Sequence, residues 1–167
     1  MVEPESAQVE VGRIATAVGH VAYRRVNPGL GLPLLVIHGG PGAGHRYLRK
    51  LERLATNREI VFYDQLGCGD SLATNEAPAE GETLWEIQRF ADEIDFVREH
   101  LGLTDVHLLG HSSGGWLALE YLSRQPDGVR SAILANTAAS IADFSRGING
   151  LVDALDDAAR RVIRSYE

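Results

Sequence analysis

One short segment, from Gly110 to Gly115, has the composition of a turn that makes a serine reactive. It fits the pattern G-x-S-x-G with Ser112 at its centre. An apolar run of strand character (105–109) precedes it, and an amphipathic helix that ends before Pro126 follows it. A serine at a sharp turn from a strand into a helix has its hydroxyl exposed as a nucleophile. The chemistry that this context predicts is attack by Ser112, with negative charge developing on the substrate.

The glycines around Ser112 have a steric explanation. A serine at such a turn lies in strained backbone, where side chains two positions before and after it would collide. Gly110 and Gly114 leave that space open. Gly115 is expected to let the new helix pack close to the sheet. The turn also directs the amides of the helix N-terminus toward the reaction, so the Ser113 N–H is a candidate donor to an oxyanion.

Two further glycine-rich loops follow predicted strands. The segment His38–Gly42 comes directly after the apolar run Pro33–His38, and the segment Asp64–Ser71 comes after Glu59–Tyr63. Ligands of parallel sheets bind beyond the carboxyl ends of the strands. We therefore expect these loops and the Ser112 turn to converge on one site. Within the second loop, Asp64 is expected to brace the loop by hydrogen bonds rather than to titrate in catalysis.

Strands and helices are predicted to alternate along most of the chain. This pattern predicts an α/β fold of three layers with a mostly parallel sheet. A capping box of Thr83 and Glu86 is expected to start the second helix. The other predicted elements are two N-terminal strands (Val9–Val18, His20–Val26), a strand Val129–Asn136, and helices Arg46–Ala55 and Leu84–Leu101.

The last part of the chain differs in character. Apolar residues recur at helical spacing from Ile141 to Glu167, with Gly147 and Gly150 interrupting them, so we expect two helices or a broken one. We divide the chain into residues 1–140, a core, and residues 141–167, the start of a helical lid over the site.

Composition limits the classes of partner. The chain has 167 residues, a formal net charge of −7 and no basic patch, so we expect neither nucleic acid nor membrane as a partner. It has no long apolar run and no signal-peptide pattern. A single cysteine, Cys68, allows no intrachain disulfide, and a cytoplasmic location is the expectation.

The three motifs together resemble one enzyme family. His38-Gly39-Gly40-Pro41-Gly42, the segment Tyr63–Ser71 and the Ser112 turn stand in the order found in proline iminopeptidases, which have the α/β-hydrolase fold. The resemblance extends from about Gly12 to the end of the chain. It implies an α/β-hydrolase fold that is truncated at the start of the helical lid.

The resemblance also implies roles for residues. Ser112 would be the acylated nucleophile, and the Ser113 amide with an amide of Gly39 or Gly40 would form the oxyanion hole. Substrates would be small peptides, amides or esters with a free N-terminal residue, proline or another small residue, and no cofactor or metal is implied. One departure is Ser113, where these enzymes commonly have tryptophan, which enlarges the pocket.

A general base is missing from this scheme. The order in this fold is serine, acid, histidine, but every histidine precedes Ser112. We expect all of them to be structural: His38 in the oxyanion loop, His107 in a strand, His111 in the turn, and three at the surface or at helix ends, namely His20, His45 and His100. Asp143 is a candidate for a displaced acid and equally for a helix N-cap.

The absent histidine has a large expected effect. Its removal from a serine hydrolase costs about 10⁶-fold in turnover. The last predicted strand would also form an exposed apolar edge of the sheet. We therefore expect a second polypeptide, the C-terminal part of the same protein, to supply the acid and the base.

Two alternatives stay open. An esterase or lactonase would use the same machinery, with the lid deciding the substrate. A non-catalytic α/β module that binds a ligand or a partner would explain the absent histidine without a second chain.

Overall fold

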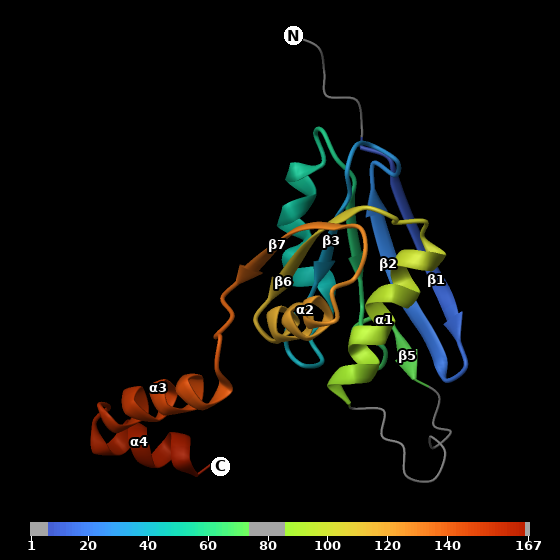
Figure 1. Cartoon of the computed structure of the whole chain (residues 1–167). Helices are drawn as coiled ribbons and strands as arrows, with labels where there is room; N and C mark the ends of the chain where they lie inside the picture. The colour runs from blue at the N-terminus through green and yellow to red at the C-terminus, as the bar shows by residue number, and fades with distance from the viewer. Residues whose placement is uncertain (1–6, 74–85, 166–167) are drawn as a thin grey trace. The chain divides into compact units, whose positions relative to one another are not determined.

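The computed structural model describes residues 7–73 and 86–165, which form two compact units divided between Thr137 and Ala138. The first unit is a sheet with helices on both faces (Figure 1). The strands of the sheet are β1 (Val9–Thr16), β2 (Gly19–Val26), β3 (Leu34–Ile37), β4 (Ile60–Tyr63), β5 (Leu72–Ala73), β6 (Val106–His111) and β7 (Val129–Ala135).

The sheet has the order β1-β2-β4-β3-β6-β7, with β5 paired to β2. The hairpin of β1 and β2 is antiparallel, and β2 also pairs antiparallel with β4. From β4 through β3 and β6 to β7 all pairing is parallel. The chain therefore leaves the carboxyl ends of β3, β4 and β6 on the same side of the sheet, and the motifs that follow these strands lie close together.

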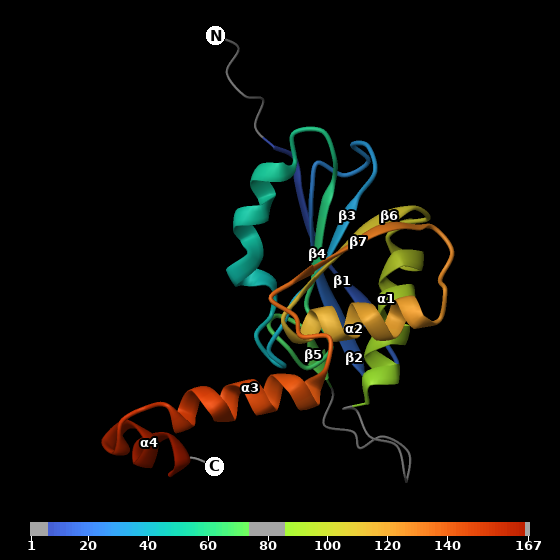
Figure 2. The ribbon, with the colours of Figure 1, turned by 60° about the vertical axis from the view of Figure 1, so that its left-hand side comes forward.

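Within the described residues, three helices cover the two faces of the sheet. They are η1 (His45–Leu54), α1 (Ile87–His100) and α2 (Ser113–Ser123). Figure 2 shows α1 and α2 on one face and η1 on the other. The described residues thus have the three layers and the mostly parallel sheet that the sequence predicted.

Alternation along the buried strands explains the two faces. Leu35 and Ile37 belong to the cluster that packs with α1 and α2, whereas Leu34 and Val36 belong to the cluster on the η1 side. All four side chains of β3 and all four of β4 are buried, as expected for strands covered on both faces.

Two predicted helices differ in detail. The segment predicted as a helix over Arg46–Ala55 is a 3₁₀ helix, and its Leu54 is exposed while Leu48 and Leu51 pack on the sheet. The helix predicted from Leu84 begins at Ile87 in the described residues. Glu86 is its N-cap residue and its side chain makes no capping hydrogen bond, so the capping box is wrong in its placement of Glu86.

The first residues of that prediction, including Thr83 and Leu84, lie outside the described residues. No helix in the described ranges 7–73 and 86–165 is long and apolar enough to cross a membrane.

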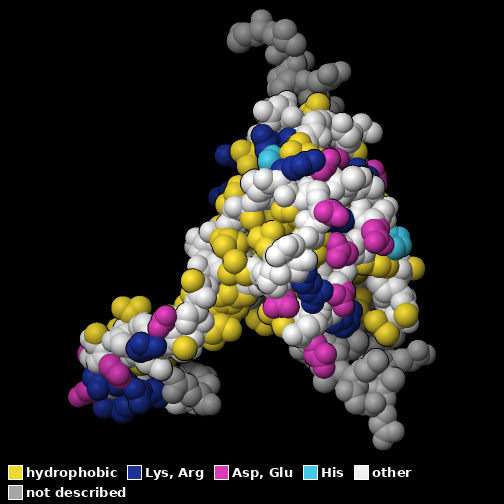
Figure 3. Space-filling model, in the orientation of Figure 1, with side chains coloured by type: hydrophobic (Ala, Val, Ile, Leu, Met, Phe, Trp, Pro, Cys, Tyr) yellow, Lys and Arg dark blue, Asp and Glu magenta, His cyan; other side chains and the backbone are white. Residues whose placement is uncertain are grey.

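The last parallel strand, β7, lies at the edge of the sheet. It pairs with β6 and, among the described residues, with no strand on its other side. Ile133 and Leu134 on it are 49% and 43% exposed, and apolar side chains gather over this strand in Figure 3. The exposed apolar edge that the sequence predicted is present in the structure.

The second unit contains α3 (Ile141–Asp153) and α4 (Asp157–Arg164). Ser140 caps α3 by accepting a hydrogen bond from the Asp143 amide, and Asp156 caps α4 by accepting from the Ala158 and Ala159 amides. The sequence predicts two helices or a broken one; the described residues contain two, and the break falls between Asp153 and Asp157 and not at Gly147 or Gly150. The N-cap Asp156 starts a new helix after the end of α3, whereas internal glycines weaken a helix without stopping it.

Candidate active site

Ser112 occupies the turn between β6 and α2 in a backbone conformation that is unusual for a residue with a side chain. Its φ is 56° and its ψ is −123°. The surrounding backbone fixes this conformation, because the Ser112 amide donates to the Ala135 carbonyl at 2.9 Å and the Thr137 hydroxyl donates to the Ser112 carbonyl at 3.0 Å. Strained backbone of this kind persists only where such contacts hold it in place.

The neighbouring glycines are required by close contacts of the backbone. A Cβ on Gly110 would lie 2.5 Å from the Gly114 carbonyl oxygen, and one on Gly114 would lie 2.4 Å from the carbonyl oxygens of Ile37 and His38. Gly114 therefore lets α2 approach the end of β3. The expected close packing at Gly115 is confirmed on its other side: a Cβ on Gly110 of β6 would lie 2.7 Å from the Gly115 Cα, and a Cβ on Gly115 would lie 1.9 Å from the Thr137 hydroxyl oxygen.

The loop after β3 lies directly against the turn. A Cβ on Gly39 would be 2.8 Å from the Cβ of Ser112 and 2.6 Å from the His111 carbonyl oxygen. Ser112 is thus next to the Gly39–Gly40 backbone, as the hypothesis of an oxyanion hole requires. The structure brings together all four predicted site residues, namely Ser112, Ser113, Gly39 and Gly40.

The hydrogen bonds of Gly39 separate the two candidate amides of this loop. The Gly39 amide donates to the Tyr47 hydroxyl at 2.8 Å, so it already has an acceptor. The Gly39 carbonyl accepts from Nδ1 of His38 at 2.8 Å. In a trans peptide the carbonyl and the next amide point in opposite directions, so the Gly40 N–H points away from His38. The geometry favours Gly40 over Gly39 as the donor from this loop.

The second candidate donor is on the other side of Ser112. Ser113 is the first residue of α2, and amides in the first turn of a helix have no acceptor within that helix. The positive end of the helix dipole reinforces this amide. Gly40 and Ser113 together form a pair of amides suited to holding a developing oxyanion.

His38 is a structural brace in a defined protonation state. Its Nε2 accepts from the Gln65 amide at 3.0 Å, so in the neutral ring the proton is on Nδ1, which donates to Gly39. Complete burial lowers the pKa of His38, although the hydrogen bond to Gly39 acts in the opposite direction. A neutral imidazole with both nitrogens bonded leaves no basic atom for Ser112.

Asp64 joins two loops next to the site. It accepts hydrogen bonds from the amide of His45 at 2.5 Å, from Nδ1 of His45 at 2.8 Å and from the Asp70 amide at 2.8 Å. Burial alone would raise the pKa of Asp64, but these hydrogen bonds outweigh it and lower the pKa. Asp64 therefore braces its loop as an anion, in agreement with the sequence-based expectation.

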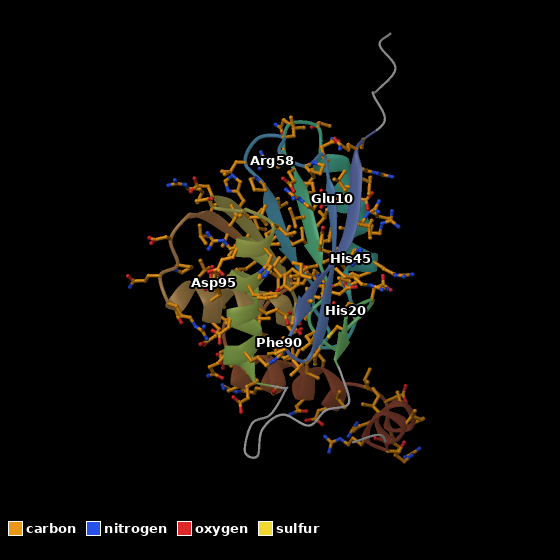
Figure 4. The ribbon with its side chains drawn as sticks, turned by 90° about the vertical axis from the view of Figure 1, so that its right-hand side faces the viewer. Glu10, His20, His45, Arg58, Phe90 and Asp95 are labelled. Carbon is orange, nitrogen blue, oxygen red and sulfur yellow. The ribbon has the colours of Figure 1, made fainter. Side chains whose placement is uncertain are left out.

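The other imidazoles also have partners away from Ser112. Nδ1 of His107 contacts the Ser131 hydroxyl at 2.7 Å, and Nδ1 of His111 contacts the Tyr47 hydroxyl at 2.9 Å. His20 on β2 and His45 at the start of η1 are labelled in Figure 4. His45 is 6% exposed, so its prediction as a helix-end residue is correct but it is not a surface residue. Among the described residues, no histidine is hydrogen-bonded to Ser112.

Asp143 lies in the first turn of α3, where it is exposed and forms an ion pair with Arg146 at 2.7 Å. It is not itself the N-cap residue, which is Ser140. Among the described residues, no group of three or more His, Cys, Asp or Glu side chains is arranged to hold a metal ion.

Sequence reasoning missed two residues near the site. Tyr47 lies off the leucine stripe of its helix, and nothing in the local pattern distinguishes it. Glu93 on α1 is buried, and its carboxylate accepts from the Leu66 amide at 3.1 Å, which holds the loop after β4. Burial raises the pKa of Glu93 to about 7, against the opposing effects of the Leu66 amide and Arg89.

This fold and this turn define a known class of protein. Residues 33–164 match the family with the alpha/beta hydrolase fold, and the chain belongs to that family.

Individual relatives give a more specific comparison than the family as a whole. The chain is 42% identical over 138 residues to a proline iminopeptidase of Lactobacillus delbrueckii subsp. bulgaricus, a match that covers 81% of this chain and 46% of the relative. The crystal structure of a proline iminopeptidase from Mycobacterium smegmatis superposes with a TM-score of 0.81 at 33% identity, covering 94% of this chain and 54% of that one. An N-acyl homoserine lactonase, AidH, has a TM-score of 0.66 at 25% identity, covering 80% and 47%.

The chain spans about half the length of the relatives that it matches.

Proposed function

We propose that this chain provides the nucleophile and the oxyanion hole of a serine hydrolase. The enzyme would release N-terminal residues, proline or other small residues, from peptides, or cleave aminoacyl amides. The observation that carries this proposal is the position of Ser112: a strained turn at the N-terminus of α2, in contact with the Gly39 backbone. The similarity to proline iminopeptidases supports the class of substrate.

The reaction would proceed through an acyl-enzyme. The Ser112 hydroxyl oxygen attacks the substrate carbonyl and its proton passes to a base. The Gly40 and Ser113 amides hold the resulting oxyanion. The carbon–nitrogen bond then breaks, and the amine leaves with the proton from the base. Water attacks the ester, its proton passes to the base and from there to Ser112, and the acid product is released.

The base and its acid would come from a second polypeptide, the C-terminal part of the same protein. No histidine follows Ser112 in this sequence, and the imidazoles that precede it are bonded elsewhere. The exposed apolar edge at β7 supports this arrangement, because further strands pairing there would cover it. A cytoplasmic place of action agrees with the single, buried Cys68 thiol.

Native and denaturing mass spectrometry of the purified protein tests the second polypeptide. A second chain that travels with this one is the expected result. A monodisperse single chain that hydrolyses substrate would contradict that part of the proposal.

Labelling with a fluorophosphonate tests the nucleophile. The complemented protein should take up one label, and Ser112→Ala should take up none, with Ser123→Ala as the matched control that keeps labelling. A complemented protein that is not labelled at Ser112 would contradict the hydrolase proposal and favour a non-catalytic binding module.

An esterase or lactonase is the second candidate. The similarity to a lactonase structure favours it, as does Ser113, whose small side chain leaves room beside Ser112. A panel of prolyl, alanyl, ester and lactone substrates separates the two. Higher kcat/KM for the prolyl and alanyl amides supports the aminopeptidase, and higher kcat/KM for the ester or lactone supports the alternative.

A further inference from the structure

One side chain joins the oxyanion loop to the nucleophile turn. The Tyr47 hydroxyl, on η1, accepts a hydrogen bond from the Gly39 amide at 2.8 Å and lies 2.9 Å from Nδ1 of His111. His111 is the residue directly before Ser112, and it is 64 positions from Tyr47 in sequence. The hydroxyl therefore bridges two segments that each provide one amide of the oxyanion hole.

The direction of these hydrogen bonds follows from the donors. A backbone N–H can only donate, so the Tyr47 oxygen accepts from Gly39 and its own proton remains to be donated. Nδ1 of His111 is the acceptor within reach, which leaves the proton of the neutral imidazole on Nε2. The two rings meet edge to face, with centroids 5.3 Å apart and planes at 66°. The bridge is thus directional and not simply a contact.

The bridge also determines which amide faces the substrate. Tyr47 occupies the Gly39 amide, while His38 holds the Gly39 carbonyl. Both polar groups of Gly39 are therefore fixed, and the orientation of the next amide, Gly40, is fixed with them. Without the hydroxyl, the peptide before Gly39 would be held only at its other end, where Gln65 Nε2 donates to the His38 carbonyl at 2.8 Å, and the distance between the Gly40 and Ser113 amides would vary more.

We propose that Tyr47 is a positioning residue for the oxyanion hole. Through Gly39 on one side and His111 on the other, it holds the two amide donors in fixed relation. This inference rests on the proposed serine hydrolase function. Tyr47 acts through the backbone, so its loss should weaken binding of the transition state more than binding of the substrate.

Tyr47→Phe in the complemented, hydrolytically active protein is the test. We expect kcat to fall by about 10- to 100-fold, which is no more than the fall caused by removing one oxyanion donor. KM should change by less than about threefold. The affinity for a trifluoromethyl ketone inhibitor, whose adduct carries an oxyanion, should fall by the same factor. Tyr23→Phe is the matched control, because Tyr23 also has a hydrogen-bonded hydroxyl, to Glu10, away from this site.

His111 provides an independent variant. His111→Ala should reduce kcat, and the double variant with Tyr47→Phe should lose little more, because both changes break the same bridge. His111→Asn, which keeps an acceptor near the position of Nδ1, should recover part of the loss.

The outcomes are distinguishable. If the unaltered complemented protein neither hydrolyses substrate nor takes up a fluorophosphonate, the proposed function fails and this inference falls with it. If that protein is active and Tyr47→Phe leaves kcat and the ketone affinity unchanged, or changes KM alone, the inference is overturned and the proposed function stands.

Discussion

Two regions of the molecule are stabilised by different kinds of contact. One is the set of loops around Ser112, at the carboxyl ends of the parallel strands, and the other is the pair of helices α3 and α4. Around Ser112, buried polar groups and glycines are fixed by contacts between segments far apart in sequence, such as Asp64 with His45 and Gly114 with Ile37. In α3 and α4 no residue is buried, and the caps and ion pairs are local, as with Ser140 and Asp143.

The difference shows what each region depends on. The loops around Ser112 are held by packing and by buried hydrogen bonds, so a small change in shape or charge there should be costly. The helices leave apolar residues exposed, for example Leu151 at 69% and Ile141 at 61%. Their local stability should respond mainly to helix propensity.

Replacement of glycine by alanine, at Gly114 in α2 and at Gly147 in α3, tests this comparison most directly. The largest effect is expected in α2. In Gly114→Ala the new Cβ would lie 2.4 Å from two backbone carbonyl oxygens, which cannot move without shifting β3 or α2. We expect the free energy of unfolding to fall by about 3 kcal/mol. Urea denaturation of the protein measures it. No loss of stability would mean that α2 does not pack closely on β3.

Asp64→Asn tests the buried anion. The amide keeps the shape but loses one acceptor oxygen, and we expect a loss of about 2–3 kcal/mol at neutral pH. Because the pKa of Asp64 is lowered, its contribution is present above the ordinary value of 3.8 and is lost as the pH falls through the lower folded pKa. The unfolding curves of the unaltered protein and of Asp64→Asn should therefore differ at neutral pH and converge at acid pH. A constant difference would contradict the role of the charge.

Glu93→Gln tests the buried carboxyl group on α1. The folded pKa of about 7 lies above the ordinary value of 4.5, so the native state binds the proton more tightly. The stability associated with Glu93 is fully present below pH 4.5 and is lost as the pH rises through about 7. Between these pH values, the free energy of unfolding of Glu93→Gln should fall by about 1–3 kcal/mol less than that of the unaltered protein. Thermal unfolding over this pH range measures it, and identical pH profiles would contradict the prediction.

Gly147→Ala in α3 should have the smallest effect and the opposite sign to Gly114→Ala. A Cβ at Gly147 would meet nothing within 4 Å. Alanine should stabilise the helix by about 0.5–1 kcal/mol. Hydrogen exchange of the α3 amides should slow by a corresponding factor of about 2–5. Faster exchange would mean that this face of the helix has a close partner.

Several features could be predicted from the sequence because their signals are local. The apolar runs of β3 and β4, the glycines around Ser112 and the change in character at Ile141 each reflect the order of neighbouring residues. The start of α1 and the break between α3 and α4 were placed less well. Several polar residues compete to cap a helix, and which of them succeeds depends on the surrounding backbone.

Sequence alone determined that Ser112 lies in a tight turn between a strand and a helix, because glycine spacing and apolar periodicity are properties of consecutive residues. Only the tertiary structure decided that Tyr47 occupies the Gly39 amide and leaves that of Gly40, and that Gly114 faces β3 while Gly115 faces β6. These are contacts between segments that are separated by tens of residues. The direction of an amide or a side chain depends on which strands pair and in which register. The order of neighbouring residues does not determine either.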